Sequence, residues 1–592
     1  MNTPGILPEI LPPSATDPPA HRAAEASAAA ARRWLLLILG LALFLRLWNL
    51  DYPVWKQPDE QNIVDRALLL GHLGLNPGWF AYPSLFLYVL FAADAAFYAG
   101  GRLLGIFTSP EEFAAFYFAY PLVFHLIARS LILACGMASL VAVFRLGCAG
   151  WGAGVGLAAA GILAVSPIWV DFSRLAKQDM MMVLFLLVAA YGVIRSLETE
   201  GRGWLWTAGV AVGLAASTKY TAGLGVAWLL LAAWNRRRGR AAVIEGGGAL
   251  GLAALAFVVG TPYAVLDWPT FHAHLTGVVN FMHGTWYGAE DRQGYTYYMF
   301  YAFPRALGWP GALLGILGCG RWLYCGATRE RLLAGFAAAF YGWMGYSRIA
   351  NEHYILPILP ILALAGADLV RIAIGAEWDS HPRRSAWIAG GLAAMCLAQP
   401  LVWTLRESAI LPACDTRDLA GRWIAEHVAP GTRILSEAYG PFLTLAPGRL
   451  DELISEQERV HPGRGMRLRY ERARAHVGAG HWYNEMPLFA NEFLSPPEVA
   501  AYDLDRALAQ GYTTVVLSSA VYDRYRRFPG RYPIQNAFFD RVTQTGRLLI
   551  QVDQATPWCC PRTWNERVAE AAASQWGRPG PTLLVYQLKE QP

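Results

Sequence analysis

The sequence predicts a polytopic α-helical membrane protein with about 11 transmembrane helices and a smaller α/β domain at its C-terminal end. Two observations support this fold class. Hydrophobic residues make up 55% of the 592 residues and charged residues only 16%, whereas soluble domains carry roughly 25% charged residues. From about Asp415 onward, charged residues become frequent, and short strand-like runs alternate with helical patterns. The first part of the chain is therefore predicted to lie in a bilayer and the second part in water.

The N-terminal residues 1–31 are rich in Pro and Ala and lack hydrophobic periodicity, so we expect a disordered tail there. The apolar run 34–45 follows Arg32-Arg33 and lacks a cleavage site, which predicts an uncleaved first span. Most of the later apolar segments approach the roughly 20 residues that a bilayer requires. They run near 120–146, 151–170, 180–197, 204–217, 220–235, 241–260, 298–322, 331–347, 354–372 and 385–405.

The segment 82–104 is long enough to span, but we predict that it does not cross. If it stays on one side, later basic groups such as 236–240 fall on the same side as Arg32-Arg33. This arrangement satisfies the positive-inside bias. We therefore expect 82–104 to be a re-entrant or surface piece of a first outer loop over about 51–119. The protein is then a multi-pass protein of the bacterial inner (plasma) membrane, with its N-terminus in the cytoplasm and its C-terminus outside.

The predicted organisation is a cytoplasmic tail (1–31), a transmembrane domain (32–410) and an extracytoplasmic α/β domain (411–592). The last domain has no Gly-rich phosphate loop, so we do not expect it to bind a nucleotide. The net charge of +5 is mild and gives no indication of nucleic acid as a partner. Within this domain we expect strands over 433–437, 513–518, 548–552 and 582–588, and helices over 416–428, with Asp415 as N-cap, and over 503–509.

Under this topology, ionisable and aromatic residues collect at the outer face. Carboxylates cost several kcal/mol in lipid, so they are expected to face water or a bound partner. Chance would distribute such groups over both faces, and a shared cavity at the membrane edge explains their common side. The residues are Asp59 and Glu60 in the first outer loop, Asp171, Arg174, Lys177 and Asp179 in the next, Lys219 and Tyr220 in a short turn, His283 in a longer loop, and Arg348, His353 and Tyr354 before a span.

Five short motifs follow one another along the chain: Asp59-Glu60, Phe80-Ala-Tyr-Pro-Ser84, Ser173-Arg-Leu-Ala-Lys-Gln-Asp179, Ser217-Thr-Lys-Tyr220 and His353-Tyr-Ile-Leu-Pro357. Together they resemble the GT-C glycosyltransferases. Within these, the chain is similar to glycosyltransferase family 39, which includes protein O-mannosyltransferases and lipid A aminoarabinose transferases. The resemblance covers about 32–405. It implies transfer of one sugar from a polyprenyl-phosphate donor in the membrane to an acceptor (a protein, lipid or cell-wall glycan) on the outer face.

The resemblance places the first-loop acid of this family at Asp59 or Glu60 and its second-loop acid at Asp179. One departure is Lys177-Gln178, where Arg-Pro is expected. Inverting transfer needs a base that removes the acceptor proton while the phosphate leaves from the opposite face. Asp59 is the first candidate and Glu60 the second, unless the pair only complements a helix dipole. Asp179 is expected to orient the acceptor or the base, unless it caps the span that begins at Met180.

The departing phosphate needs cations. Lys219 and Arg348 stand at membrane-edge positions where a lipid phosphate would lie, although each could equally be an end-of-span charge. The expected donor site further includes Tyr220, His353 and Tyr354. Acids at the site leave room for a divalent cation, but no ligand set for a metal is legible and no cofactor is predicted. Candidates for contacts with the acceptor or with loops are Asp171, Arg174, Lys177 and His283.

Two other classes of function fit the same composition. A secondary transporter or lipid flippase would also carry acids in a membrane domain, but such proteins show paired halves and acids near mid-membrane. We find no convincing internal repeat, and the acids gather at one face. A noncatalytic cell-wall scaffold is the third reading, and loss of activity in a folded Asp59 variant would separate it from an enzyme.

Overall fold

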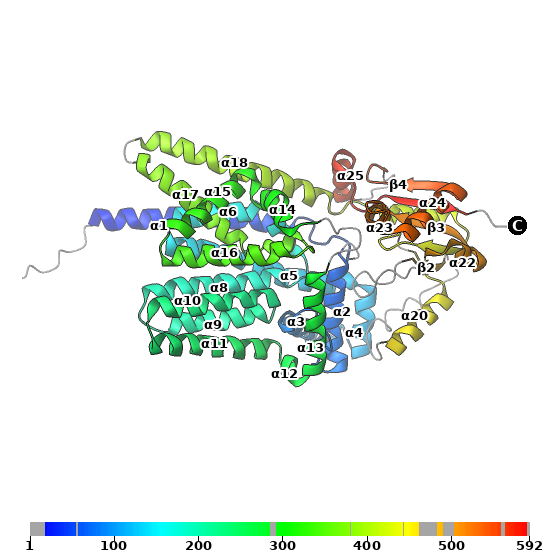
Figure 1. Cartoon of the computed structure of the whole chain (residues 1–592), viewed down its shortest axis with the longest axis horizontal. Helices are drawn as coiled ribbons and strands as arrows, with labels where there is room; N and C mark the ends of the chain where they lie inside the picture. Colours follow the sequence, from blue (N-terminus) through cyan, green and yellow to red (C-terminus); the bar gives the residue numbers. More distant parts are fainter. Residues whose placement is uncertain are drawn as a thin grey trace, which may run out of the picture.

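The structure is a computed structural model that describes residues 18–54, 57–284, 292–378, 381–441, 443–460, 482–488, 502–557 and 563–588. Long helices lie side by side in a bundle, and a domain that contains a β-sheet lies at one end of this bundle (Figure 1). The division between a helical N-terminal part and an α/β C-terminal part follows the change of composition near Asp415.

The helices of the bundle coincide with the segments that were predicted to span the membrane. A contiguous apolar core runs through the bundle, and α17 is among its most deeply buried helices. The helices are α1 (Pro18–Leu47), α5 (Pro121–Gly150), α6 (Ala153–Val165) with α7 (Pro167–Arg174), α8 (Asp179–Glu198), α9 (Gly203–Ala216), η2 (Tyr220–Gly225) with α10 (Val226–Arg236), α11 (Arg240–Gly260), α14 (Gly294–Tyr297) and η3 (Tyr298–Ala302) with α15 (Phe303–Cys325), α16 (Thr328–Tyr346), α17 (Leu359–Trp378) and α18 (Pro382–Ile410).

Six of the described helices are long and apolar enough to cross a membrane, and a seventh span results if the bent pair α6–α7 is counted as one. These six include α3 (Leu85–Leu103), which the sequence placed in the first outer loop. The chain is therefore a multi-pass membrane protein. The total of about 11 spans, and the exclusion of α3 from them, stay predictions.

The predicted first outer loop forms helices between the bundle and the C-terminal domain. It contributes α2 (Pro58–Leu73), α3 and α4 (Pro110–Ala119), and α12 (Tyr263–Leu266) and α13 (Trp268–His283) come from a later connection. In Figure 1, α2, α4 and α13 run across the direction of the long bundle helices. The connection between α10 and α11, which holds the basic residues 236–240, lies at the opposite end of the bundle.

Two bundle helices are broken by residues that dictate the break. The α6–α7 pair bends by 68° between Val165 and Pro167, where the Ser166 side chain accepts a hydrogen bond from the backbone N–H of Trp169 and Pro167 starts the new helix. Within α15, Gly308 has φ 71°, a conformation that glycine adopts without steric cost. The first bend brings α7 against η4 (Glu352–Ile355) and α18.

Helix α1 begins at Pro18, inside the stretch 1–31 for which the sequence predicted no regular structure. Residues 23–31 are rich in Ala, the residue with the strongest helix propensity, and they extend the helix of the first span toward the N-terminus. This difference concerns residues 18–31, since 1–17 lie outside the described residues.

The C-terminal domain contains a five-stranded mixed sheet with the order β2-β1-β3-β5-β4. β1 is parallel to β2 and β3, and β5 is antiparallel to β3 and β4. Four of the strands coincide with predicted ones, whereas β2 was missed because its short run contains no β-branched or aromatic residue. The strands are β1 (Arg433–Ser436), β2 (Asn484–Pro487), β3 (Tyr512–Ser518), β4 (Arg547–Val552) and β5 (Leu583–Gln587).

Helices pack on both faces of this sheet, which has separate apolar cores on its two sides. Successive strand residues point to opposite faces, so Leu435 joins the core under α24 while Ile434 joins the core under α19. Asp415 caps α19 as predicted and accepts from the backbone N–H of Arg417 at 2.9 Å. The helices are α19 (Thr416–His427), α20 (Pro447–Val460), α22 (Leu504–Ala509), α23 (Ser519–Arg526), α24 (Pro533–Thr545) and α25 (Trp564–Trp576).

Candidate active site

Residues from four separate connections meet at the N-terminal end of α2. Asp59 lies in the first turn of α2, and Asp179 is the first residue of α8. Lys219 immediately precedes η2, and His353 lies in η4. The first turn of a helix stabilises a carboxylate because its backbone N–H groups are unpaired and the dipole is positive there. The fold therefore brings acids and bases together that are far apart along the chain.

Asp59 and Lys177 form the first ion pair of this cluster. Lys177 Nζ donates to Asp59 Oδ2 at 2.8 Å. The lysine is buried, but the Asp59 side chain is 57% exposed. One side of this carboxylate thus meets a fixed cation, and the other side is open to an incoming molecule.

Asp179 and Lys219 form the second ion pair, with 2.5 Å between Lys219 Nζ and Asp179 Oδ1. Both side chains are buried, and among the described residues Asp179 Oδ2 has no hydrogen-bond partner. The Lys219 ammonium also lies 5.0 Å from the ring centre of Tyr354. Gln178 is the N-cap of α8, and no side chain caps this helix. The capping role that the sequence left open for Asp179 is thereby excluded.

The two lysines and His353 influence one another electrostatically. Burial alone would lower the pKa of Lys177, but its neighbours, which include Asp179 and Asp59, hold that pKa above its usual value. Burial lowers the pKa of Lys219, and Asp179 opposes this effect only in part. Burial and the two lysines hold the pKa of His353 well below its ordinary value. The imidazole of His353 is therefore neutral and can both donate and accept a hydrogen bond.

Tyr82 belongs to the same cluster, although it was not among the predicted site residues. Lys177 Nζ lies 5.8 Å from its ring centre, and burial raises the pKa of the Tyr82 hydroxyl. The signal was present in the motif Phe80-Ala-Tyr-Pro-Ser84, which the resemblance already used. The hydroxyl of Tyr220 donates to the carbonyl oxygen of Phe80 at 3.0 Å. In this structure Tyr220 therefore positions the Tyr82 segment.

Glu60 has surroundings very different from those of Asp59. Its side chain is fully buried in an ion pair with Arg129, whose Nη2 lies 2.7 Å from Glu60 Oε2. Glu60 Oε1 accepts from the Tyr52 hydroxyl at 2.8 Å, from Arg129 Nε at 3.1 Å and from the Ala176 amide at 2.7 Å. Arg129 also lies over the Tyr52 ring, with 3.5 Å between its Cζ and the ring centre. This carboxylate ties α2 and α5 to the connection before α8.

Asp171 and Arg174 belong to a second ionic network beside the cluster. They pair with each other at 2.6 Å within α7. Arg305 of α15 connects them to other elements: its guanidinium lies 3.0 Å from Glu352, 2.8 Å from Glu407 and 4.0 Å from Asp171. Arg305 and Glu407 were not predicted. A charged residue inside an apolar segment, as Arg305 is, was the signal that could have revealed this network.

For the remaining two predicted residues, the described part of the chain shows no ion pair with a member of this cluster. Arg348 is exposed and forms no ion pair with any described residue. His283 is exposed at the end of α13, and its ring lies 6.4 Å from that of Tyr346. The described part of the chain contains no group of three or more His, Cys, Asp or Glu side chains that could hold a metal ion.

Comparison with known proteins places this geometry in context. Residues 125–279, which include Arg174, Asp179 and Lys219, match the family model described as dolichyl-phosphate-mannose-protein mannosyltransferase. None of the curated protein sequences matches the chain.

Three solved structures resemble this chain over 84–87% of its length. The oligosaccharyltransferase of Archaeoglobus fulgidus in the apo form has a TM-score of 0.50 at 12% identity, covering 85% of this chain and 72% of its own. AglB from the same organism, in complex with an inhibitory peptide and a dolichol-phosphate, has a TM-score of 0.50 at 11% identity, covering 87% and 73%. ArnT from Cupriavidus metallidurans, bound to undecaprenyl phosphate, has a TM-score of 0.45 at 13% identity, covering 84% and 95%. The expected resemblance to the GT-C glycosyltransferases is confirmed, and the chain has their fold.

Proposed function

We propose that this protein is an integral-membrane glycosyltransferase that moves a single sugar from a polyprenyl-phosphate donor to an acceptor on the outer face of the membrane. The observation that carries the proposal is the partly exposed Asp59 beside the buried cations Lys177 and Lys219, in a chain with this fold. The matching family is described by a dolichyl-phosphate-mannose donor, and the similar AglB structure contains a dolichol-phosphate. Both support a lipid-phosphate sugar as the donor.

Asp59 is the base in this proposal. It removes the proton from the acceptor hydroxyl while the phosphate leaves from the opposite face of the sugar, so the transfer inverts the anomeric centre. Accessibility supports Asp59 over Glu60, because Asp59 is 57% exposed whereas Glu60 is fully buried and accepts four hydrogen bonds. Asp179, held by Lys219, orients the reacting groups.

The donor phosphate has to compete for cations that are already paired. Two aspartates and two lysines cancel each other's charge in the cluster. Asp59 is the only exposed member, so it can swing away from Lys177 when phosphate binds there. That exchange would leave the carboxylate of Asp59 free to accept a proton. Arg348, His353 and Tyr354 complete the proposed phosphate and sugar contacts, and Arg348 would supply a cation that no described residue neutralises.

The difference between the two ends of the bundle supports the proposed outer-face location. The basic 236–240 connection lies at one end and the C-terminal domain at the other (Figure 1). The positive-inside bias puts the basic end in the cytoplasm. The proposed centre, at the N-terminal end of α2, is then extracytoplasmic.

The test is transfer of labelled sugar by the purified full-length protein. Radiolabelled polyprenyl-phosphate sugars would be incubated with the protein and a membrane extract, and the label followed into acceptor. Asp59→Asn should abolish transfer. Asp51→Asn, which changes an exposed acid of the same loop that has no ion pair among the described residues, should not. A protein that transfers no sugar but moves lipid or ions across vesicles would support the transporter class, and equal transfer by both variants would exclude Asp59 as the base.

A further inference from the structure

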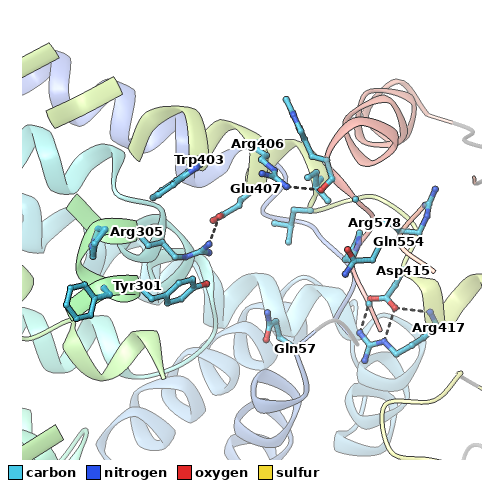
Figure 2. A pocket seen from close by; sticks show the side chains of 18 of the residues that line it. Gln57, Tyr301, Arg305, Trp403, Arg406, Glu407, Asp415, Arg417, Gln554 and Arg578 are labelled. Atoms are coloured by element: carbon cyan, nitrogen blue, oxygen red, sulfur yellow. Dashed lines mark hydrogen bonds and ion pairs between the residues drawn. The ribbon is translucent and has the colours of Figure 1, made fainter. Parts of the chain in front are cut away.

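A cavity of about 930 Å³ lies between the bundle and the C-terminal domain. Figure 2 shows its walls: Tyr301 and Arg305 on one side, Trp403 and Glu407 above, and Asp415 of the C-terminal domain opposite. The two parts of the chain therefore build this site together.

The cavity adjoins the proposed catalytic centre. Gln57, two residues before Asp59 in the chain, projects into it from below (Figure 2). Arg305 in its wall pairs with Glu352 at 3.0 Å, and Glu352 is followed directly by His353. A molecule in the cavity would thus lie beside the chain segments that carry Asp59 and His353.

The cations of the cavity are mostly neutralised. Arg305 lies 2.8 Å from Glu407, Arg417 lies 2.8 Å from Asp415, and Arg578 lies 2.6 Å from Glu570. Because these three guanidinium groups already have carboxylate partners, most of the positive charge of the lining is compensated. Arg406 also lines the cavity and pairs with no described carboxylate; its guanidinium donates to the carbonyl oxygen of Trp576 at 2.7 Å and lies 5.8 Å from the Trp576 ring centre.

Aromatic faces form the other part of the lining. Trp309 of α15 and Trp576 of α25 both line the cavity, and their side chains are 53% and 44% exposed, so a ligand can reach them. The amide side chains of Gln57 and Gln554 stand among them. Rings with an apolar face, beside groups that both donate and accept hydrogen bonds, match a ligand with apolar C–H faces and many hydroxyls.

We infer that this interdomain cavity binds a neutral oligosaccharide portion of the acceptor, so that the acceptor is a glycan or carries one. This inference rests on the proposed function, because it takes the cavity to lead to Asp59. The sugar rings stack on Trp576 and its aromatic neighbours, and their hydroxyls bond to the amides and to the paired charged groups.

The test uses the full-length protein in detergent on an array of neutral oligosaccharides, anionic oligosaccharides and unglycosylated Ser- and Thr-rich peptides. We expect retention of neutral oligosaccharides. Trp576→Ala should weaken their apparent affinity about ten-fold, because it removes a stacking face. Trp564→Ala is the matched control: it changes the exposed first residue of the same helix, which does not line the cavity, and it should leave binding unchanged. Gln57→Ala should weaken binding as well; Gln57 is the exposed N-cap residue of α2, but its side chain makes no capping hydrogen bond that the change would remove.

Each other outcome overturns the inference. These outcomes are no binding of neutral oligosaccharides, binding of anionic oligosaccharides or peptides alone, and neutral-glycan binding that is equally strong in Trp576→Ala. Sugar transfer without neutral-glycan binding would reject this inference and leave the proposed function intact. Glycan binding without any transfer would reject the proposed function, and with it the role of the bound glycan as an acceptor, while the cavity would still be a glycan-binding site.

Discussion

Replacing Glu60 by Gln distinguishes a structural carboxylate from a catalytic one, since the sequence could not choose between Glu60 and Asp59. Both acids lie in the first turn of α2. Glu60 and Arg129 are fully buried against each other, whereas Asp59 is 57% exposed beside Lys177. The two substitutions, Glu60→Gln and Asp59→Asn, therefore remove the same charge from opposite environments.

The expected cost of Glu60→Gln follows from its contacts. Removing one partner of a buried ion pair costs about 3–5 kcal/mol, because the other charge stays uncompensated in the interior. Glutamine keeps one oxygen for Tyr52 and the Ala176 amide, but its NH₂ group would face Arg129 Nη2, which now lies 2.7 Å from an acceptor. We therefore expect about 3 kcal/mol, which lowers Tm by roughly 2–4 °C in a chain of this size, because the entropy of unfolding grows with the number of residues. Asp59→Asn removes a half-exposed pair that contributes about 0–1 kcal/mol.

The assay combines thermal unfolding of the purified protein with sugar-transfer turnover. We expect Glu60→Gln to unfold early and, at temperatures where it is folded, to retain transfer. Asp59→Asn should unfold like wild type and lose activity by about 10²–10⁴-fold, the usual contribution of a general base. A Glu60→Gln protein with the Tm of wild type and no transfer would refute this reasoning and make Glu60 the base.

Three further results are expected. Arg348→Gln should weaken donor binding by about ten-fold or more without changing Tm, because it removes an exposed cation that pairs with no described residue; donor affinity equal to wild type would remove Arg348 from the site. Burial raises the pKa of Glu437 to about 8, so the folded protein keeps a proton that the unfolded chain loses above about pH 4.3. The stability of the folded protein should therefore fall as pH rises from about 4.3 to about 8. Glu437→Gln should raise Tm above about pH 8 but not near about pH 4.3, and an equal change of Tm at these two pH values would contradict the prediction. A Cys placed at Arg238 should react only with membrane-permeant thiol reagents, whereas a Cys at Gln554 should also react with impermeant ones; equal labelling from outside would overturn the topology.

The architecture was predictable because its signals are local. Runs of apolar residues mark the bundle helices, and the change of composition near Asp415 marks the C-terminal domain. Asp415 itself was recognisable as a helix cap, since capping involves only neighbouring residues. β2 was missed because its residues Asn484–Pro487 have no intrinsic preference for a strand and depend on pairing with β1.

The motifs also located most of the candidate site. Asp59, Lys177, Asp179, Lys219 and His353 were singled out by residue type and by their side of the membrane, and the structure brings them together. Arg348 and His283 shared the same signals, but among the described residues neither of them forms an ion pair with a member of the cluster. Sidedness restricts where a residue can be, but it leaves open which residues on that side are neighbours.

Only the tertiary structure decided which charges pair. Asp59 meets Lys177 across 118 residues of chain, and Glu60 meets Arg129 across 69. Adjacent acids in one helical turn point in different directions, so one enters the core and the other faces the solvent. Their environments depend on how α2 is rotated against α5 and on the course of the connection before α8. Hydrophobic length and residue type were sufficient to specify the membrane domain and the place of its acids along the chain. The pairing of these acids depends on packing between distant segments, and no local pattern of residues records such packing.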